Sequence, residues 1–159
     1  MHRRTAHLHR FLTAGTIVAL LAAGLVPAAV GAASRIGHLT VNAVSLNGAG
    51  TKTRLKPGAG FTVKMDFRSD SSAWCPKCQN QIVVGFAKRI DGRWEKVAGG
   101  KCIYSKDGRR TERGFRFRMT APKGPGRYKL TLMAPQAYNC TRAMKWQARL
   151  SAIASITVK

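Results

Sequence analysis

The sequence predicts an all-β protein: a single β-sandwich of seven to eight strands that follows an N-terminal signal peptide. After residue 33, apolar and polar residues alternate in most segments, which is the period of a half-buried strand, and no segment keeps a helical stripe. Turn signals built from Gly and Pro separate these segments. The first 33 residues differ from the rest because they combine a basic start with a long apolar run.

Residues 1–33 show the three parts of a secretory signal peptide. A basic start at 1–10 precedes an apolar run at 11–29, and small residues follow, so we expect cleavage after Ala32 or Ala33. An uncleaved membrane anchor is the alternative, because the apolar run approaches the length that spans a bilayer. Cleavage would leave residues 34–159 as one domain without a transmembrane span, located outside the cell or in the cell envelope.

The first half of the domain predicts three strands. One starts at Leu39 and ends at the turn residues 47–50. The Pro-Gly turn at 57–60 introduces a second strand at 61–68, in which apolar and polar residues alternate cleanly. Residues 81–87 are apolar on both faces apart from the first, so we expect a central strand there.

The middle of the domain predicts a hairpin followed by a charged loop. The Asp-Gly pair at 91–92 is a strong hairpin signal, with a return strand through 94–97. The glycine pair at 99–100 is expected to turn the chain again, into a strand at 102–104. Residues 106–113 are rich in charge and are expected to form a loop.

The last third predicts alternating strands at 115–119 and 128–132 and a closing strand at 153–158. Residues 137–147 are expected to be a loop or a short helix. The corner from Met119 to Tyr128, in which a Tyr follows a Pro-Gly turn, is similar to the corner before the penultimate strand of bacterial immunoglobulin-like domains. This resemblance implies an immunoglobulin-like β-sandwich at the level of the fold superfamily, and no functional residues.

The four cysteines are expected to form two disulfides, because an even number of cysteines in an oxidising compartment indicates structural disulfide bonds. Three pairings are possible. We favour Cys78 with Cys102 and Cys75 with Cys140, since a bridge between Cys75 and Cys78 closes a tight ring and restricts the unfolded chain little. A zinc site built from the four thiols is an alternative that the spacing does not favour.

The segment from Trp74 to Cys78 also resembles the W-C-x-x-C site of thioredoxin-like oxidoreductases. That resemblance implies thiol-disulfide exchange by Cys75 and Cys78. Such a site needs a helix that starts at the first cysteine, whereas residues 79–86 indicate a strand.

The domain is strongly basic. The whole chain carries a net charge of +22, and removing the signal peptide leaves 25 basic against six acidic residues, a net charge of +19. A field of this size attracts polyanions, so anionic polymers or an anionic cell-envelope surface are the expected partners. The alternative is that the charge only keeps the protein soluble.

If the strands follow the immunoglobulin-like order, those at 61–68 and 115–119 are neighbours and their outward side chains form a basic stripe. We predict that this stripe and the following charged loop bind polyanions through Lys64, Arg68, Arg116, Arg118, Arg109 and Arg110. The alternative interpretation is that cations on exposed strands only discourage aggregation.

The sequence therefore predicts an exported, non-catalytic binding domain. His38 is the one histidine after residue 33, and no nucleophile or carboxylate pair indicates an enzyme. We expect no metal and no cofactor, and no motif indicates sequence-specific binding of nucleic acid. A thiol-disulfide exchange protein and a structural surface protein without a dedicated ligand remain the alternatives.

Overall fold

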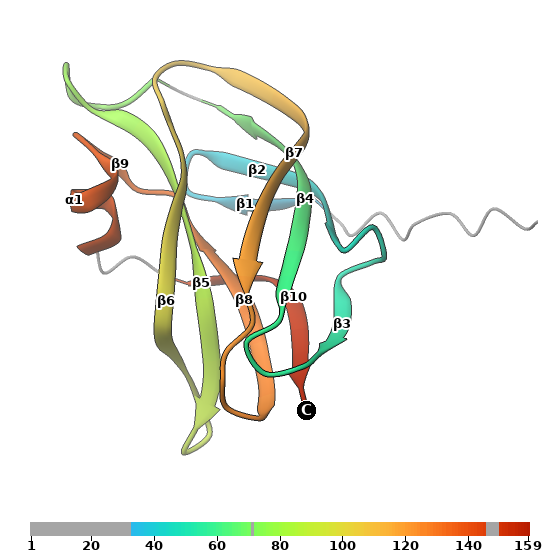
Figure 1. Ribbon diagram of the computed structural model, residues 1–159. Helices are drawn as coiled ribbons and strands as arrows, with labels where there is room; N and C mark the ends of the chain where they lie inside the picture. The colour runs from blue at the N-terminus through green and yellow to red at the C-terminus, as the bar shows by residue number, and fades with distance from the viewer. Residues whose placement is uncertain (1–32, 71, 146–149) are drawn as a thin grey trace, which may run out of the picture.

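The computed structural model describes residues 33–70, 72–145 and 150–159, which form two β-sheets and one short helix (Figure 1). The first sheet has four strands in the order β1-β2-β4-β7. Its strands are β1 (Ser34–Ile36), β2 (Leu39–Leu46), β4 (Gly60–Ser69) and β7 (Arg110–Thr120). All of its neighbouring strands are antiparallel.

The second sheet has six strands. Five follow the order β3-β10-β8-β5-β6, and β9 pairs with the first two residues of β5. Its strands are β3 (Lys52–Leu55), β10 (Ser151–Val158), β8 (Gly126–Met133), β5 (Gln79–Ile90), β6 (Arg93–Lys106) and β9 (Gln136–Ala137). Strand β3 is parallel to β10, and the other pairs in this sheet are antiparallel.

The prediction of an all-β sandwich is confirmed, with ten strands in the described residues rather than seven to eight. The additional strands β1, β3 and β9 have two to four residues each, which is too short for an alternating pattern to reveal. Most of the predicted signal peptide, residues 1–32, lies outside the described residues. No helix in the described part is long and apolar enough to cross a membrane.

The long hairpin of β5 and β6 confirms one turn and corrects another. Asp91 and Gly92 both have positive φ, at 46° and 82°, as a two-residue hairpin turn of this type requires. The turn predicted at 99–100 is wrong, because β6 continues through both glycines. The register against β5 shifts between Val84 and Phe86, so the glycines are absorbed in a bulge within the strand pair.

The charged loop predicted at 106–113 is also shorter than expected. Strand β6 ends at Lys106 and β7 already begins at Arg110, so three residues connect the two sheets. Local composition could not reveal this, since Arg and Thr side chains on an exposed strand are as polar as those in a loop.

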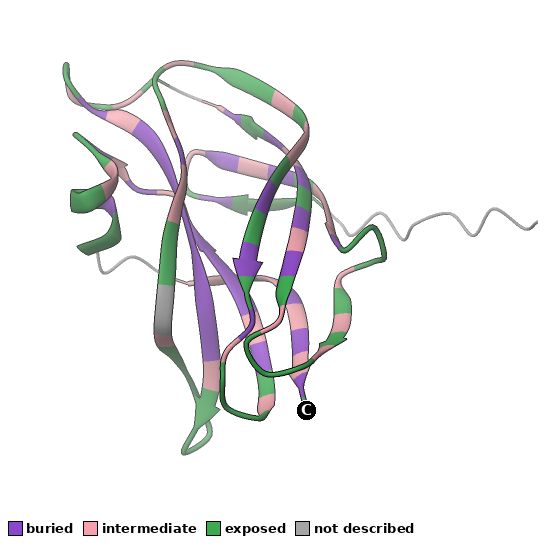
Figure 2. Cartoon of the chain, viewed as in Figure 1, coloured by how far each residue is buried: buried purple, intermediate pink, exposed green. Residues whose placement is uncertain are grey.

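The main core lies between the two sheets. Bands of buried and exposed residues alternate along β4 and β7, as Figure 2 shows. Three aromatic rings join the layers: Phe67 of β4 meets Tyr104 of β6 with ring centroids 5.1 Å apart, and Phe115 of β7 at 5.5 Å. Both contacts are nearly perpendicular, which is the favourable edge-to-face arrangement.

A second, smaller core lies on the other face of β5, under the helix α1 (Cys140–Lys145). Val83 and Ala143 are buried there together with Met133 and Ala137. The Asn139 side chain accepts a hydrogen bond from the backbone N of Arg142 at 2.9 Å, which caps the helix. Strand β5 is therefore covered on both faces, which explains why its sequence is apolar without alternation.

Candidate functional site

The outer face of the four-stranded sheet holds a row of basic side chains. Strands β4 and β7 are neighbours, as predicted, with Lys64 directly opposite Arg116 and Thr62 opposite Arg118. These three basic side chains and Arg68 are exposed, while Val63, Met65 and Phe67 of β4 are buried in the core. We call Lys64, Arg68, Arg116 and Arg118 the basic face.

The one carboxylate between these cations has a structural partner. Asp66 accepts a hydrogen bond at 2.6 Å from the backbone N of Gly114. Gly114 has a φ of +63° and lies where the register between β4 and β7 shifts, so the carboxylate satisfies a backbone donor at a bulge. The only carboxylate between the cations of the basic face is thus engaged with the backbone.

Most of the basic face lacks an ion-pair partner in the described residues. The described residues form two ion pairs, Arg68 with Asp70 at 2.7 Å and Lys106 with Glu112 at 3.6 Å. Neither involves Lys64, Arg116 or Arg118. Two like charges directly opposite each other destabilise a strand pair, so the placement of Lys64 against Arg116 costs the sheet some stability.

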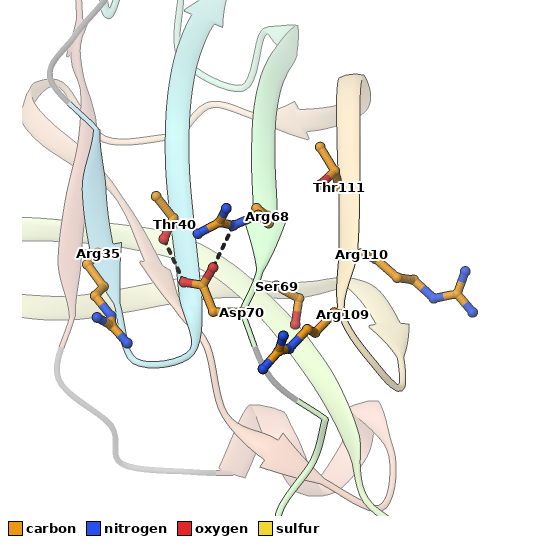
Figure 3. Close-up of a pocket in the computed structure, with 8 residues that line it drawn as sticks. All are labelled: Arg35, Thr40, Arg68, Ser69, Asp70, Arg109, Arg110 and Thr111. Carbon is orange, nitrogen blue, oxygen red and sulfur yellow. Dashed lines mark hydrogen bonds and ion pairs between the residues drawn. The ribbon is translucent and has the colours of Figure 1, made fainter.

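At one end of the basic face, the sheet carries an open groove of about 500 Å³ (Figure 3). We call it the arginine groove. Arg35 of β1, Thr40 of β2 and Arg68 of β4 approach it from three adjacent strands, and the start of β7 forms its other side. Its remaining lining residues are Ser69, Asp70, Arg109, Arg110 and Thr111.

Asp70 organises this groove. Its carboxylate accepts hydrogen bonds from Thr40 Oγ1 and Arg68 Nε, each at 2.7 Å. These two bonds hold the pKa of Asp70 below its ordinary value, so the carboxylate stays ionised and fixes the Arg68 guanidinium. Four arginine residues line the groove against this single carboxylate, which leaves it strongly positive.

The two predicted loop arginines separate in the structure. Figure 3 shows Arg109 directed along the groove, whereas Arg110 extends away from Asp70. The Nε of Arg110 donates instead to the backbone oxygen of Asp107, at 3.1 Å. Sequence reasoning missed Arg35 and Thr40, although the outward position of Thr40 follows from the alternation in its strand.

The predicted disulfide pairing is wrong. The bridges are Cys75–Cys78 and Cys102–Cys140. A turn brings Cys75 and Cys78 together, with the backbone N of Cys78 donating to the oxygen of Cys75 at 3.0 Å. Helix α1 packs beside β6 and brings Cys140 to Cys102. Packing therefore decides which cysteines pair, and the entropy of the closed loops, on which the prediction relied, does not. Two disulfides are typical of proteins outside the cytoplasm.

The thioredoxin-like context that the W-C-x-x-C segment requires is absent from the described residues. Residues 72–78 contain no helix, only a bend and a turn at 74–77, and the strand β5 follows them as expected. The cysteine pair is therefore displayed on a loop at one end of a sandwich.

No protein-family model matches the chain, and no curated protein matches it at a significant level.

Proposed function

We propose that this protein is an exported, non-catalytic binding domain whose basic face and arginine groove bind anionic polymers or an anionic cell-envelope surface. The observation that supports this most directly is that three of the four cations of the basic face, Lys64, Arg116 and Arg118, form no ion pair within the described residues. Such charges remain available to attract an external anion, because no carboxylate is paired with them.

The length of the row suits a polymer better than a small ion. From the pair Thr62 and Arg118 to the pair Arg68 and Thr111, the row extends over seven residues of β4, which is six steps along the strand. At about 3.4 Å per residue, this is roughly 20 Å of strand. A chain of phosphate, sulfate or carboxylate groups could contact several cations along that length, and each contact adds to the affinity.

The arginine groove would hold individual anionic groups at the end of the row. Guanidinium groups bind phosphate, sulfate and carboxylate oxygens in pairs, with fixed geometry. The Asp70 carboxylate already orders one of them, Arg68, so less conformational entropy is lost when an anion binds.

We also propose that the sandwich is immunoglobulin-like. The parallel pairing of β3 with the last strand β10 and the central position of β5 and β8 suit that topology. In addition, the hydroxyl group of Tyr128, near the start of β8, donates a hydrogen bond to the backbone oxygen of Gly124 at 2.8 Å. A tyrosine that bonds to the backbone a few residues upstream of this strand is a feature of immunoglobulin-like corners.

Export is supported by two features. Residues 1–33 read as a signal peptide, and both pairs of cysteines are bridged. An anionic cell-envelope polymer would then be present where the protein is delivered.

The test is binding to heparin and to soluble polyphosphate as a function of salt. We compare the wild type with Arg116→Ser/Arg118→Ser, which removes two charges from the basic face. Lys52→Ser/Arg54→Ser is the matched control, because it removes the same charge from exposed positions on β3, in the other sheet.

We expect affinity to fall steeply with salt, and the slope of log affinity against log salt to decrease by about two in the Arg116/Arg118 variant, near one for each lost contact. The control should lose much less. Equal losses in both variants would mean that only net charge matters, and would overturn the assignment to this face.

A further inference from the structure

A second groove, of about 440 Å³, lies beside the Cys75–Cys78 bridge, apart from the arginine groove. We call it the cysteine groove. Both cysteines of the bridge line it, together with the aromatic residues Trp74 and Tyr138. Trp74 is 74% exposed and Tyr138 is 52% exposed, which is unusual for large apolar side chains. Arg142 and Lys145 of α1 complete one side.

The two cysteines of the bridge differ in access. Cys78 is buried, with 5% of its surface exposed, whereas Cys75 is partly exposed. An incoming thiol would therefore reach the sulfur of Cys75, and Cys78 would act as the leaving group. This difference in access determines which sulfur is attacked and which one leaves.

The loop is held in place without the bridge. The side chain of Gln136 accepts a hydrogen bond from the backbone N of Trp74 at 3.1 Å and donates one to the oxygen of Ser72 at 3.3 Å. Asp107 accepts a further bond from the backbone N of Ala73 at 3.0 Å. Because these contacts anchor the segment to β9 and to the turn before β7, opening the bridge does not require the loop to unfold.

The charge around the groove selects the kind of thiol. Arg142 and Lys145 line it, and Lys77 between the two cysteines is exposed. None of the lining residues in the described chain is acidic. The Arg142 guanidinium lies 5.7 Å from the centre of the Tyr138 ring, so it is positioned over the groove by a cation–π contact.

We propose that Cys75–Cys78 is an exchangeable disulfide whose groove binds a thiol flanked by carboxylates, while Cys102–Cys140 is a structural disulfide that does not exchange. The thiolate sulfur of the ligand bonds to Sγ of Cys75, and the Cys75–Cys78 bond breaks. Its electron pair stays on Sγ of Cys78, which takes a proton from water. A second thiol then attacks the mixed disulfide and releases Cys75 as a thiol. In total, two thiols are oxidised to one disulfide and the bridge is reduced to two thiols.

The test measures exchange rates on the intact oxidised protein by trapping with N-ethylmaleimide and mass spectrometry. The probes are glutathione, an acidic peptide with one cysteine, and cysteamine, which is cationic. Each rate is divided by the rate of the same thiol with hydroxyethyl disulfide, because thiols differ in intrinsic reactivity.

We expect glutathione and the acidic peptide to open Cys75–Cys78 about tenfold faster than cysteamine at low salt, with the difference shrinking as salt is added. The ligand should be found on Cys75, and Cys102–Cys140 should stay closed. A faster reaction of the peptide than of glutathione would identify the thiol source as a protein, and the reverse would identify a small molecule.

Arg142→Ala/Lys145→Ala should remove most of the preference for anionic thiols. Lys52→Ser/Arg54→Ser is again the control of equal charge and should retain it. The proposal is overturned if cysteamine reacts as fast as the anionic thiols, if both bridges open together, or if the two double variants behave alike.

Discussion

The two disulfides should contribute unequally to stability, and the difference follows from their positions in the chain. In the chain-entropy account, a bridge stabilises by restricting the unfolded chain, and its effect grows with the length of the closed loop. Cys75–Cys78 joins residues three apart, and Cys102–Cys140 joins residues 38 apart. The same relation gives about 2 kcal/mol for the first bridge and about 4 kcal/mol for the second.

The native contacts strengthen this contrast. Cys102–Cys140 ties α1 to β6, and the buried side chain of α1 in the small core is Ala143. The sulfurs of Cys102 and Cys140 each lie 3.3 Å from Oε1 of the buried Gln81. Removing the bridge therefore loosens the helix as well as lengthening the free loop.

The assay is guanidinium unfolding of Cys102→Ala/Cys140→Ala and of Cys75→Ala/Cys78→Ala, followed by far-UV circular dichroism. With a denaturant slope of about 4 kcal/mol/M, the midpoint should fall by about 1 M in the first variant and by about 0.5 M in the second. Equal losses, or a larger loss in the Cys75/Cys78 variant, would refute the reasoning, because neither loop length nor helix attachment would then set the stability.

Two further predictions concern buried polar groups. The buried Asn80 donates to Ser69 Oγ at 2.8 Å and accepts from Gln136 Nε2 at 2.8 Å, so Asn80→Ala should cost about 1–3 kcal/mol in denaturant unfolding. Asn42→Ala at an exposed position of β2 should change stability by less than about 0.5 kcal/mol, and a similar loss in both variants would contradict this role of the Asn80 network. Burial lowers the pKa of His38 below its ordinary 6.5, against an opposing effect of Asp70. The unfolded chain then takes up the proton first, so stability should fall as the pH drops through 6.5, and His38→Gln should reduce that fall. An unchanged pH dependence in the variant would show that other groups cause it.

Much of the architecture could be predicted because it depends on local pattern. The alternation at 61–68 and 115–119 identified two half-buried strands, and the same alternation assigned Lys64 and Arg116 to the outer face. Their pairing followed once the order of strands was assumed, and the structure confirms it. The Asp-Gly hairpin at 91–92 was equally predictable, because few residue pairs accept positive φ at both positions.

The sequence by itself determined the all-β class, the even set of four cysteines and the excess of positive charge, since these depend on composition and on a period of two. Only the tertiary structure decided which cysteines meet, because the packing of α1 against β6 brings together residues far apart in the chain. It likewise brought Arg35, Arg68 and Arg109 to one groove from three different strands or their ends. Such neighbours are set by strand order and register, which local periodicity does not encode.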